Sequence, residues 1–120
     1  MITIALPYPP TVWTIYKNHG RQKTKSDRYL TWARAAGNEI LTQRVQWREK
    51  SIEGPVSVAL TVQRIDKRKR DLDNLLKAPL DLLVSMGIIE DDSLIQRVSI
   101  AWGPVEGLRV ELSSAERIAA

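Results

Sequence analysis

The sequence predicts an α+β fold, a two-layer sandwich in which two helices cover one face of a roughly four-stranded mixed sheet. Two observations lead to this prediction. The hydrophobic patterns follow the order strand, helix, strand, helix, strand, strand along the chain. In addition, 120 residues with 43% apolar and 27% charged side chains are typical of one globular domain, which we expect to span residues 1–120.

The first half of the chain contains one predicted strand and one predicted helix. Apolar side chains alternate over residues 1–6, which predicts a short strand that the proline-rich segment 7–10 ends. Residues 11–25 are polar and basic without a period, so we expect a loop there. Ser26 is a favourable N-cap residue, and the apolar side chains after it recur at helical spacing, which predicts a helix over 27–47.

The second half adds a strand, a helix and a hairpin. Residues 56–63 alternate and are rich in valine, which is the clearest strand pattern in the chain. A leucine-rich pattern predicts a helix over 72–86, and Pro79 requires that this helix begins late or is kinked there. Alternating apolar residues at 98–102 and 108–112, joined by a turn with glycine and proline, predict a hairpin.

Composition excludes several kinds of chemistry. The chain has no cysteine, which removes disulfides, zinc–thiolate sites, iron–sulfur clusters and thiol catalysis. Its single histidine, His19, argues against a multi-histidine metal site or a histidine-dependent triad. No apolar run is long enough to span a membrane, and the N-terminus lacks the pattern of a signal peptide. We therefore expect a cytoplasmic protein with no membrane partner and no organic cofactor.

The charges are segregated along the chain. Residues 1–70 carry 14 basic and 5 acidic side chains, whereas residues 71–120 carry 4 basic and 9 acidic ones. A basic segment of this size suggests a polyanion, such as nucleic acid, as a partner. On charge alone, a mixed solvated surface is the simpler explanation, so the interpretation depends on what the acids do.

The boundary between these two segments coincides with the most informative stretch. Five of the seven residues from 64 to 70 are basic, and Asp71 and Asp73 follow directly. Two carboxylates this close repel each other unless a cation lies between them, and Mg²⁺ prefers oxygen ligands of this kind. The alternative is that both acids cap the helix predicted over 72–86. A calcium-binding loop does not fit, because leucines stand where its glycine turn should be.

Further acids lie about twenty residues later, at Asp91 and Asp92. If the intervening helix runs antiparallel to its neighbouring strands, these acids are about 20 Å from Asp71 and Asp73. A late helix start, an acidic turn that folds back, or a second subunit that brings its own acids alongside would remove this separation. The sequence leaves all three open, and an acidic pair of this kind is also typical of an ordinary turn.

A nuclease mechanism would use these groups together. Two Mg²⁺ ions about 3.5–4 Å apart can hold the attacking water and the leaving oxygen of a phosphodiester without any histidine. Lys77 lies one helical turn from Asp73 and can bind the scissile phosphate, although it is equally placed for an ordinary ion pair with Asp73 or Asp81. The basic residues before Asp71 can hold the flanking DNA backbone or form a solvated loop.

Three stretches in this order resemble the RusA family of Holliday-junction resolvases. They are Leu6–Thr11 (LPYPPT) with Tyr16 shortly after it, Arg68–Lys77 (RKRDLDNLLK) followed by Asp81, and Gly87–Asp92 (GIIEDD). The central segment is the most diagnostic of the three. The likeness covers essentially the whole chain, and the length suits the family.

The resemblance implies a small α+β homodimer that cuts four-way DNA junctions with Mg²⁺ in recombination and repair, each subunit nicking one of two opposed strands. On this basis Asp71, Asp73 and Asp92 are the expected catalytic carboxylates and metal ligands. Lys77 is the expected catalytic lysine, and Asp91 is a lesser candidate than Asp92. The expected DNA-binding residues are Lys67, Arg68, Lys69 and Arg70. A phage or prophage origin is also implied.

Trp13 departs from the family pattern, which commonly has asparagine at this place. A tryptophan in such a loop either stacks on an unpaired base at the crossover or packs on its own domain. The sequence hypothesis is thus a Mg²⁺-dependent junction resolvase. One alternative is a non-catalytic DNA-binding module of phage origin whose acids only cap a helix, and another is a less selective nuclease for branched DNA.

Overall fold

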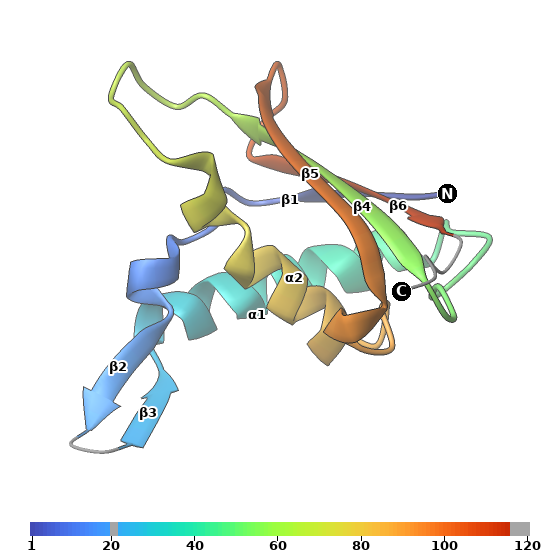
Figure 1. The fold of residues 1–120 in the computed structure, drawn as a ribbon, viewed down its shortest axis with the longest axis horizontal. Helices are drawn as coiled ribbons and strands as arrows, with labels where there is room; N and C mark the ends of the chain where they lie inside the picture. Colours follow the sequence, from blue (N-terminus) through green and yellow to red (C-terminus); the bar gives the residue numbers. More distant parts are fainter. Residues whose placement is uncertain (20–21, 116–120) are drawn as a thin grey trace.

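The computed structural model describes residues 1–19 and 22–115, which form a mixed four-stranded sheet with two helices on one face (Figure 1). The strands, in the order β1-β6-β4-β5, are β1 (Ile2–Leu6), β6 (Leu108–Ser114), β4 (Val56–Gln63) and β5 (Ile95–Gly103). The helices are α1 (Asp27–Arg44) and α2 (Lys77–Ser85). The predicted α+β class, with a four-stranded mixed sheet and two helices, is confirmed.

Strand β4 lies inside the sheet, and its inward side chains from Val56 to Val62 are at most 2% exposed. It pairs in parallel with β5 and antiparallel with β6, and α2 forms the crossover between β4 and β5. The predicted hairpin of 98–102 with 108–112 is therefore wrong, because β4 lies between these strands. Alternation identifies the buried face of a strand but not its neighbours.

The connection from β5 to β6 crosses the end of β4, where Gln63 holds it. The backbone N–H of Gln63 donates to the Gly107 carbonyl oxygen at 2.9 Å, and its side-chain oxygen accepts from the Gly107 N–H at 2.8 Å. Gly107 has φ of +66°, and a Cβ at this position would lie 2.4 Å from the Leu6 carbonyl oxygen. Only glycine meets both conditions.

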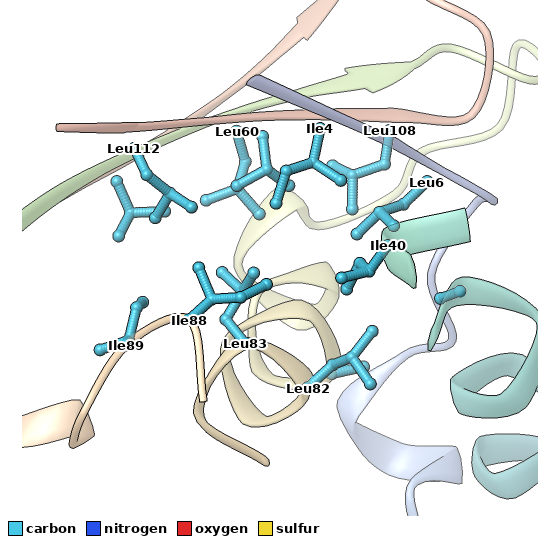
Figure 2. Close-up of a cluster of buried hydrophobic side chains, with 14 of the residues drawn as sticks. Ile4, Leu6, Ile40, Leu60, Leu82, Leu83, Ile88, Ile89, Leu108 and Leu112 are labelled. Carbon is cyan, nitrogen blue, oxygen red and sulfur yellow. The ribbon is translucent and has the colours of Figure 1, made fainter. Parts of the chain in front are cut away.

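The core lies between the sheet and the helices. Side chains that meet there, at most 2% exposed and drawn in Figure 2, include Ile4, Leu60, Leu108 and Leu112 from the strands and Ile40, Leu83, Ile88 and Ile89 from the helical layer. Burying a side chain of this size contributes about 1.5–3 kcal/mol. This packing fixes α2, and with it the acidic segments at its two ends, against the sheet.

The segment predicted as one helix over 72–86 is divided. A 3₁₀ helix (Leu72–Leu75) precedes α2, and Pro79 lies in the first turn of α2. Backbone N–H groups in the first turn have no acceptor within the helix, so the N–H that proline lacks is not needed there. Of the two possibilities for Pro79, the late helix start is therefore the observed one. Gly87, with φ of +72°, closes the other end of α2 in a Schellman motif.

The loop predicted over 11–25 is wrong. This segment forms a 3₁₀ helix (Val12–Thr14) and two antiparallel strands, β2 (Tyr16–His19) and β3 (Gln22–Lys25). The two strands read YKNH and QKTK, so no apolar alternation marks them in the sequence. The fully buried Ile15 anchors the start of the hairpin in the core.

Helix α1 begins as predicted and ends three residues early. The Ser26 hydroxyl accepts a hydrogen bond from the Tyr29 N–H at 3.1 Å, which confirms it as the N-cap. The helix ends at Arg44, and the Lys50 ammonium donates to the carbonyl oxygens of Arg44 and Trp47 at 2.7 and 2.6 Å. A lysine in this position satisfies terminal carbonyls of the last turn. None of the described helices combines the length and apolar character needed to cross a membrane.

Candidate active site

One carboxylate, Asp66, organises the basic segment between β4 and α2. Its two oxygens accept from Nε and Nη2 of Arg70 at 3.1 and 2.6 Å, and one of them also accepts from the backbone N–H of Arg68 at 3.0 Å. The hydrogen bonds from Arg70 lower the pKa of Asp66 to about 2. Arg70 is consequently held in one orientation, whereas Lys67, Arg68 and Lys69 are exposed. The Arg68 side chain makes a long ion pair with Asp66, at 3.9 Å.

Asp71 and Asp73 lie where the chain passes from this segment toward α2. Asp71 has an extended backbone before the 3₁₀ helix Leu72–Leu75, Asp73 lies in the first turn of that helix, and both side chains are exposed. Neither carboxylate makes a capping hydrogen bond or an ion pair with any residue that the structure describes. Asp71 thus occupies the N-cap position of the 3₁₀ helix and Asp73 its first turn, but neither side chain makes the capping hydrogen bond that the alternative requires. Both carboxylates are free to serve as oxygen ligands of a hard cation.

Lys77 belongs to a charged cluster centred on Asp81. One oxygen of Asp81 accepts from the Lys77 ammonium at 3.0 Å, and the other accepts from the Lys25 ammonium at 3.2 Å. Lys25 also lies over the rings of Tyr16 and Tyr29, with its nitrogen 4.6 and 4.4 Å from the ring centroids. Of the two ion pairs considered for Lys77, the one with Asp81 is present.

This cluster raises the pKa of both lysines. The hydrogen bond to Asp81 raises the pKa of Lys77 and outweighs the effect of its partial burial. For Lys25, burial is the largest single effect and lowers the pKa, but the hydrogen bonds to Asp81 and Tyr16, together with the nearby charge of Asp81, outweigh it, so the pKa of Lys25 is raised. Both ammonium groups therefore remain charged at neutral pH, and two cations share one carboxylate.

The acidic turn after α2 borders the same cleft as this cluster. The cleft has a volume of about 390 Å³, and its lining includes Lys25, Lys77, Asp81, Asp91 and Asp92. Asp91 caps the 3₁₀ helix that follows, because its carboxylate accepts from the Ser93 N–H and hydroxyl, and these bonds lower the pKa of Asp91. Both side chains are exposed, but the Asp91 carboxylate already accepts the capping hydrogen bonds, so Asp92 is the more available to a ligand.

The three carboxylates expected to bind the metal are not gathered within one chain. Across residues 1–19 and 22–115, no group of three or more Asp, Glu, His or Cys side chains is placed to hold a metal ion. Asp71 lines a separate cavity of about 360 Å³ with Arg70 and Asn74, whereas Asp92 follows the far end of α2. Helix α2 has nine residues and is therefore about 14 Å long. Its late start does not bring the acids together.

Sequence reasoning missed two residues that organise the site. Asp66 was detectable, since an acid four residues before an arginine is a recognisable ion-pair spacing. Lys25 was not detectable, because 56 residues separate it from Asp81. Trp13 is 78% exposed, so of the two alternatives for this residue, packing on its own domain is not observed, and its ring is available to a ligand.

The fold and this arrangement of acids and cations fit a nucleic-acid-cleaving enzyme, and the comparison with known proteins agrees. A family model described as endodeoxyribonuclease RusA matches residues 7–113. The chain belongs to the RusA family of endodeoxyribonucleases, as the sequence resemblance implied.

Two of three named relatives match nearly the whole chain. It is 31% identical over 119 residues to the crossover junction endodeoxyribonuclease RusA of Escherichia coli strain K12, covering 95% of this chain and 93% of the relative. The protein of the same name from Enterobacteria phage HK97 is 30% identical over 112 residues, with 92% and 91% covered. A relative from Aquifex aeolicus, also named crossover junction endodeoxyribonuclease RusA, is 34% identical over 79 residues, which cover 66% of this chain and 60% of the relative.

Proposed function

We propose that this endodeoxyribonuclease resolves four-way DNA junctions by paired symmetric nicks, that it requires Mg²⁺, and that it acts as a homodimer. The observation that carries the proposal is the pair of exposed carboxylates, Asp71 and Asp73, which have no partner among the described residues and directly follow an ordered basic segment. The names of the relatives, crossover junction endodeoxyribonucleases, support the choice of substrate.

The donor set suits Mg²⁺, because the carboxylates of Asp71, Asp73 and Asp92 are hard oxygen ligands at exposed positions. When bound, the ion would stabilise the negative charge that develops on the phosphodiester. Asp71 and Asp73 would hold it from one chain. Lys77 would bind a non-bridging oxygen of the scissile phosphate through its ammonium, and Asp81 keeps that ammonium oriented.

The basic segment would hold the DNA on either side of the cleaved bond. Lys67, Arg68 and Lys69 are exposed and can neutralise backbone phosphates. Arg70 differs from them, because Asp66 fixes its guanidinium next to Asp71. A fixed guanidinium loses less freedom when it binds phosphate than a mobile one does. We infer that Arg70 sets the register of the strand and the other three add affinity.

Two considerations support the proposed homodimer. Within one chain Asp92 lies apart from Asp71 and Asp73, so neither a late helix start nor a folded-back acidic turn gathers the three carboxylates. A complete three-carboxylate site would therefore need the Asp92 of a second copy, an arrangement that a single chain does not test. A four-way junction also has two-fold symmetry, and two symmetric nicks are made by two subunits related by the same axis. Each subunit would then cut one of two opposed strands.

The decisive experiment is a junction-cleavage assay with Asp73→Asn. We expect this variant to bind a four-way junction as tightly as the unaltered protein and to cut nothing in Mg²⁺, because the amide removes a metal ligand without removing a DNA contact. Glu53→Gln is the matched control: Glu53 is exposed and unpaired among the described residues, and it lies outside the site. Cleavage by the Asp73 variant at the control rate would overturn the assignment.

Two further arms of this assay test the rest of the proposal. Cleavage in EDTA would exclude a metal requirement. Equal cleavage of four-way, three-way and linear DNA would favour the less selective nuclease over a junction resolvase. A sedimentation experiment on the free protein tests the homodimer, and a monomer that still makes paired nicks would contradict it.

A further inference from the structure

A pocket lined by arginines lies beside the proposed active site, and Arg70 is the one lining residue to which a DNA-binding role has already been given. It has a volume of about 290 Å³ and lies between the proline-rich segment, the start of α1 and the basic segment before Asp71. Two arginines that are 42 residues apart in the sequence line it, Arg28 from the first turn of α1 and Arg70. No Asp or Glu of the described chain lines the pocket, although Asp66 pairs with Arg70 from outside it, so the unpaired positive charge in the lining is that of Arg28.

Neither guanidinium has used all its donors. Arg28 is exposed and makes no ion pair or hydrogen bond with a described residue. Arg70 donates through Nε and Nη2 to Asp66, which leaves its Nη1 amino group without a protein acceptor. Planar guanidinium groups match the oxygens of a phosphate, and two that line one pocket provide several such donors.

The pocket also contains a polar group that lacks a partner. Tyr8 lines the pocket, and its hydroxyl is buried without a hydrogen bond to any described residue. Buried polar groups rarely lack a partner in folded proteins. Burial raises the pKa of the Tyr8 hydroxyl, so the group stays protonated and can donate. Trp32, whose indole N–H donates to the Pro7 carbonyl oxygen at 3.1 Å, holds the wall of the pocket in place.

This pocket adjoins the cavity beside the proposed metal ligand. Thr11 and Arg70 line both this pocket and the cavity that contains Asp71 and Asn74. A DNA strand whose scissile phosphate lies at Asp71 would therefore extend along Arg70 toward Arg28. The anion best placed to occupy the pocket is a neighbouring phosphate of that same strand.

We propose that Arg28 and Arg70 form a subsite for a backbone phosphate of the cleaved strand, next to the phosphate at Asp71. This inference rests on the proposed function, since it takes DNA as the substrate. The subsite adds a contact from α1, an element to which no DNA-binding role has been assigned. It would fix the direction in which the strand crosses the site.

The test compares Arg28→Gln with Arg34→Gln. Both arginines lie on α1, both are exposed, and neither has a partner among the described residues, so both variants lose one positive charge from the same helix. Junction affinity is measured in EDTA over a range of salt concentrations. One lost phosphate contact reduces the slope of log K against log salt by about 0.9. We expect this reduction for Arg28→Gln and an unchanged slope for Arg34→Gln.

Phosphate ethylation interference provides the second measurement. We expect one phosphate beside the cleaved bond whose ethylation weakens junction binding by the unaltered protein. Ethylation of the same phosphate should leave junction binding by Arg28→Gln unchanged. Equal slopes for the two variants, or the same ethylation pattern for Arg28→Gln and the unaltered protein, would overturn the subsite. The proposed function would still stand in that case, as long as the unaltered protein cuts junctions. If the unaltered protein neither bound nor cut junctions, the proposed function itself would fail.

Discussion

Replacing the Asp81 carboxylate by the isosteric amide in Asp81→Asn removes the charge that holds two lysines together. In the folded chain, Asp81 accepts from Lys77 at 3.0 Å and from Lys25 at 3.2 Å, and its side chain is 22% exposed. If Lys77 acts on the scissile phosphate, losing Asp81 releases the ammonium from its position. The variant should therefore lose turnover more than it loses stability or DNA affinity.

The size of each effect follows from the exposure of the pairs. The Lys77 side chain is 47% exposed and its pair with Asp81 spans one helical turn, so this pair contributes about 0.5 kcal/mol to folding. Lys25 is 35% exposed, and its pair lies at the upper end of such values, about 1 kcal/mol. A total of about 1.5 kcal/mol lowers the melting temperature of a chain this size by about 5–8 °C. A displacement of about 1 Å at a reacting group costs up to about 100-fold in rate.

The assay is junction cleavage under saturating enzyme, at a temperature well below the melting point of the variant. We expect the single-turnover rate of Asp81→Asn to fall about 10- to 100-fold while the junction Kd stays within about twofold. Lys25→Met keeps an apolar stem between Tyr16 and Tyr29 and leaves the Lys77–Asp81 pair intact, so its rate should fall less. An unchanged rate for Asp81→Asn, or a loss that only follows the unfolded fraction, would refute the positioning of Lys77 by Asp81.

Three further predictions concern stability. Asp66 has a folded pKa of about 2, below its ordinary value, so its ionised form favours folding: this contribution is complete above about pH 4 and disappears as the pH falls toward 2. Urea unfolding should show that the difference in the free energy of unfolding between the unaltered protein and Asp66→Asn decreases over that pH range. A difference that stays constant would contradict the prediction. Gly107→Ala should lose at least about 1 kcal/mol more stability than Gly54→Ala, because both have positive φ but only Gly107 has a backbone atom within 2.4 Å of the added Cβ; equal losses would remove the role of the clash. Trp13→Ala should change the free energy of unfolding by less than about 0.5 kcal/mol, since Trp13 is 78% exposed, and a larger loss measured by urea unfolding would show that its ring packs on the protein.

The parts of the fold that bury apolar side chains were predictable from the sequence. Alternation over 56–63 and helical spacing after Ser26 identified β4 and α1 because both elements bury one face. Strands β2 and β3 were not predicted, because their side chains are polar and the two strands are held by backbone hydrogen bonds to each other. The order of strands was also missed: apolar alternation at 98–102 and 108–112 is compatible with direct pairing or with a strand between them.

The same distinction holds for the candidate site. Asp71, Asp73 and Lys77 lie within seven residues, so one local segment carries them and sequence spacing alone placed them at a single turn. Arg28 and Lys25 come from remote elements, and only the tertiary fold brings Arg28 to the same pocket as Arg70 and Lys25 to Asp81. Asp66 is an intermediate case: its spacing from Arg70 could have predicted an ion pair, but the sequence did not show that both of its oxygens would accept from Arg70.

By itself, the sequence determined the family and the kind of chemistry available: with no cysteine and one histidine, oxygen ligands and lysines are what the chain offers. It also located the change from basic to acidic charge between Arg70 and Asp71. Only the tertiary structure decided which charges meet. Lys25 reaches Asp81 across 56 residues, whereas Asp92 stays apart from Asp71 and Asp73 within one chain. The physical reason is that local spacing fixes neighbours within a turn, while contacts between distant segments depend on how buried faces pack.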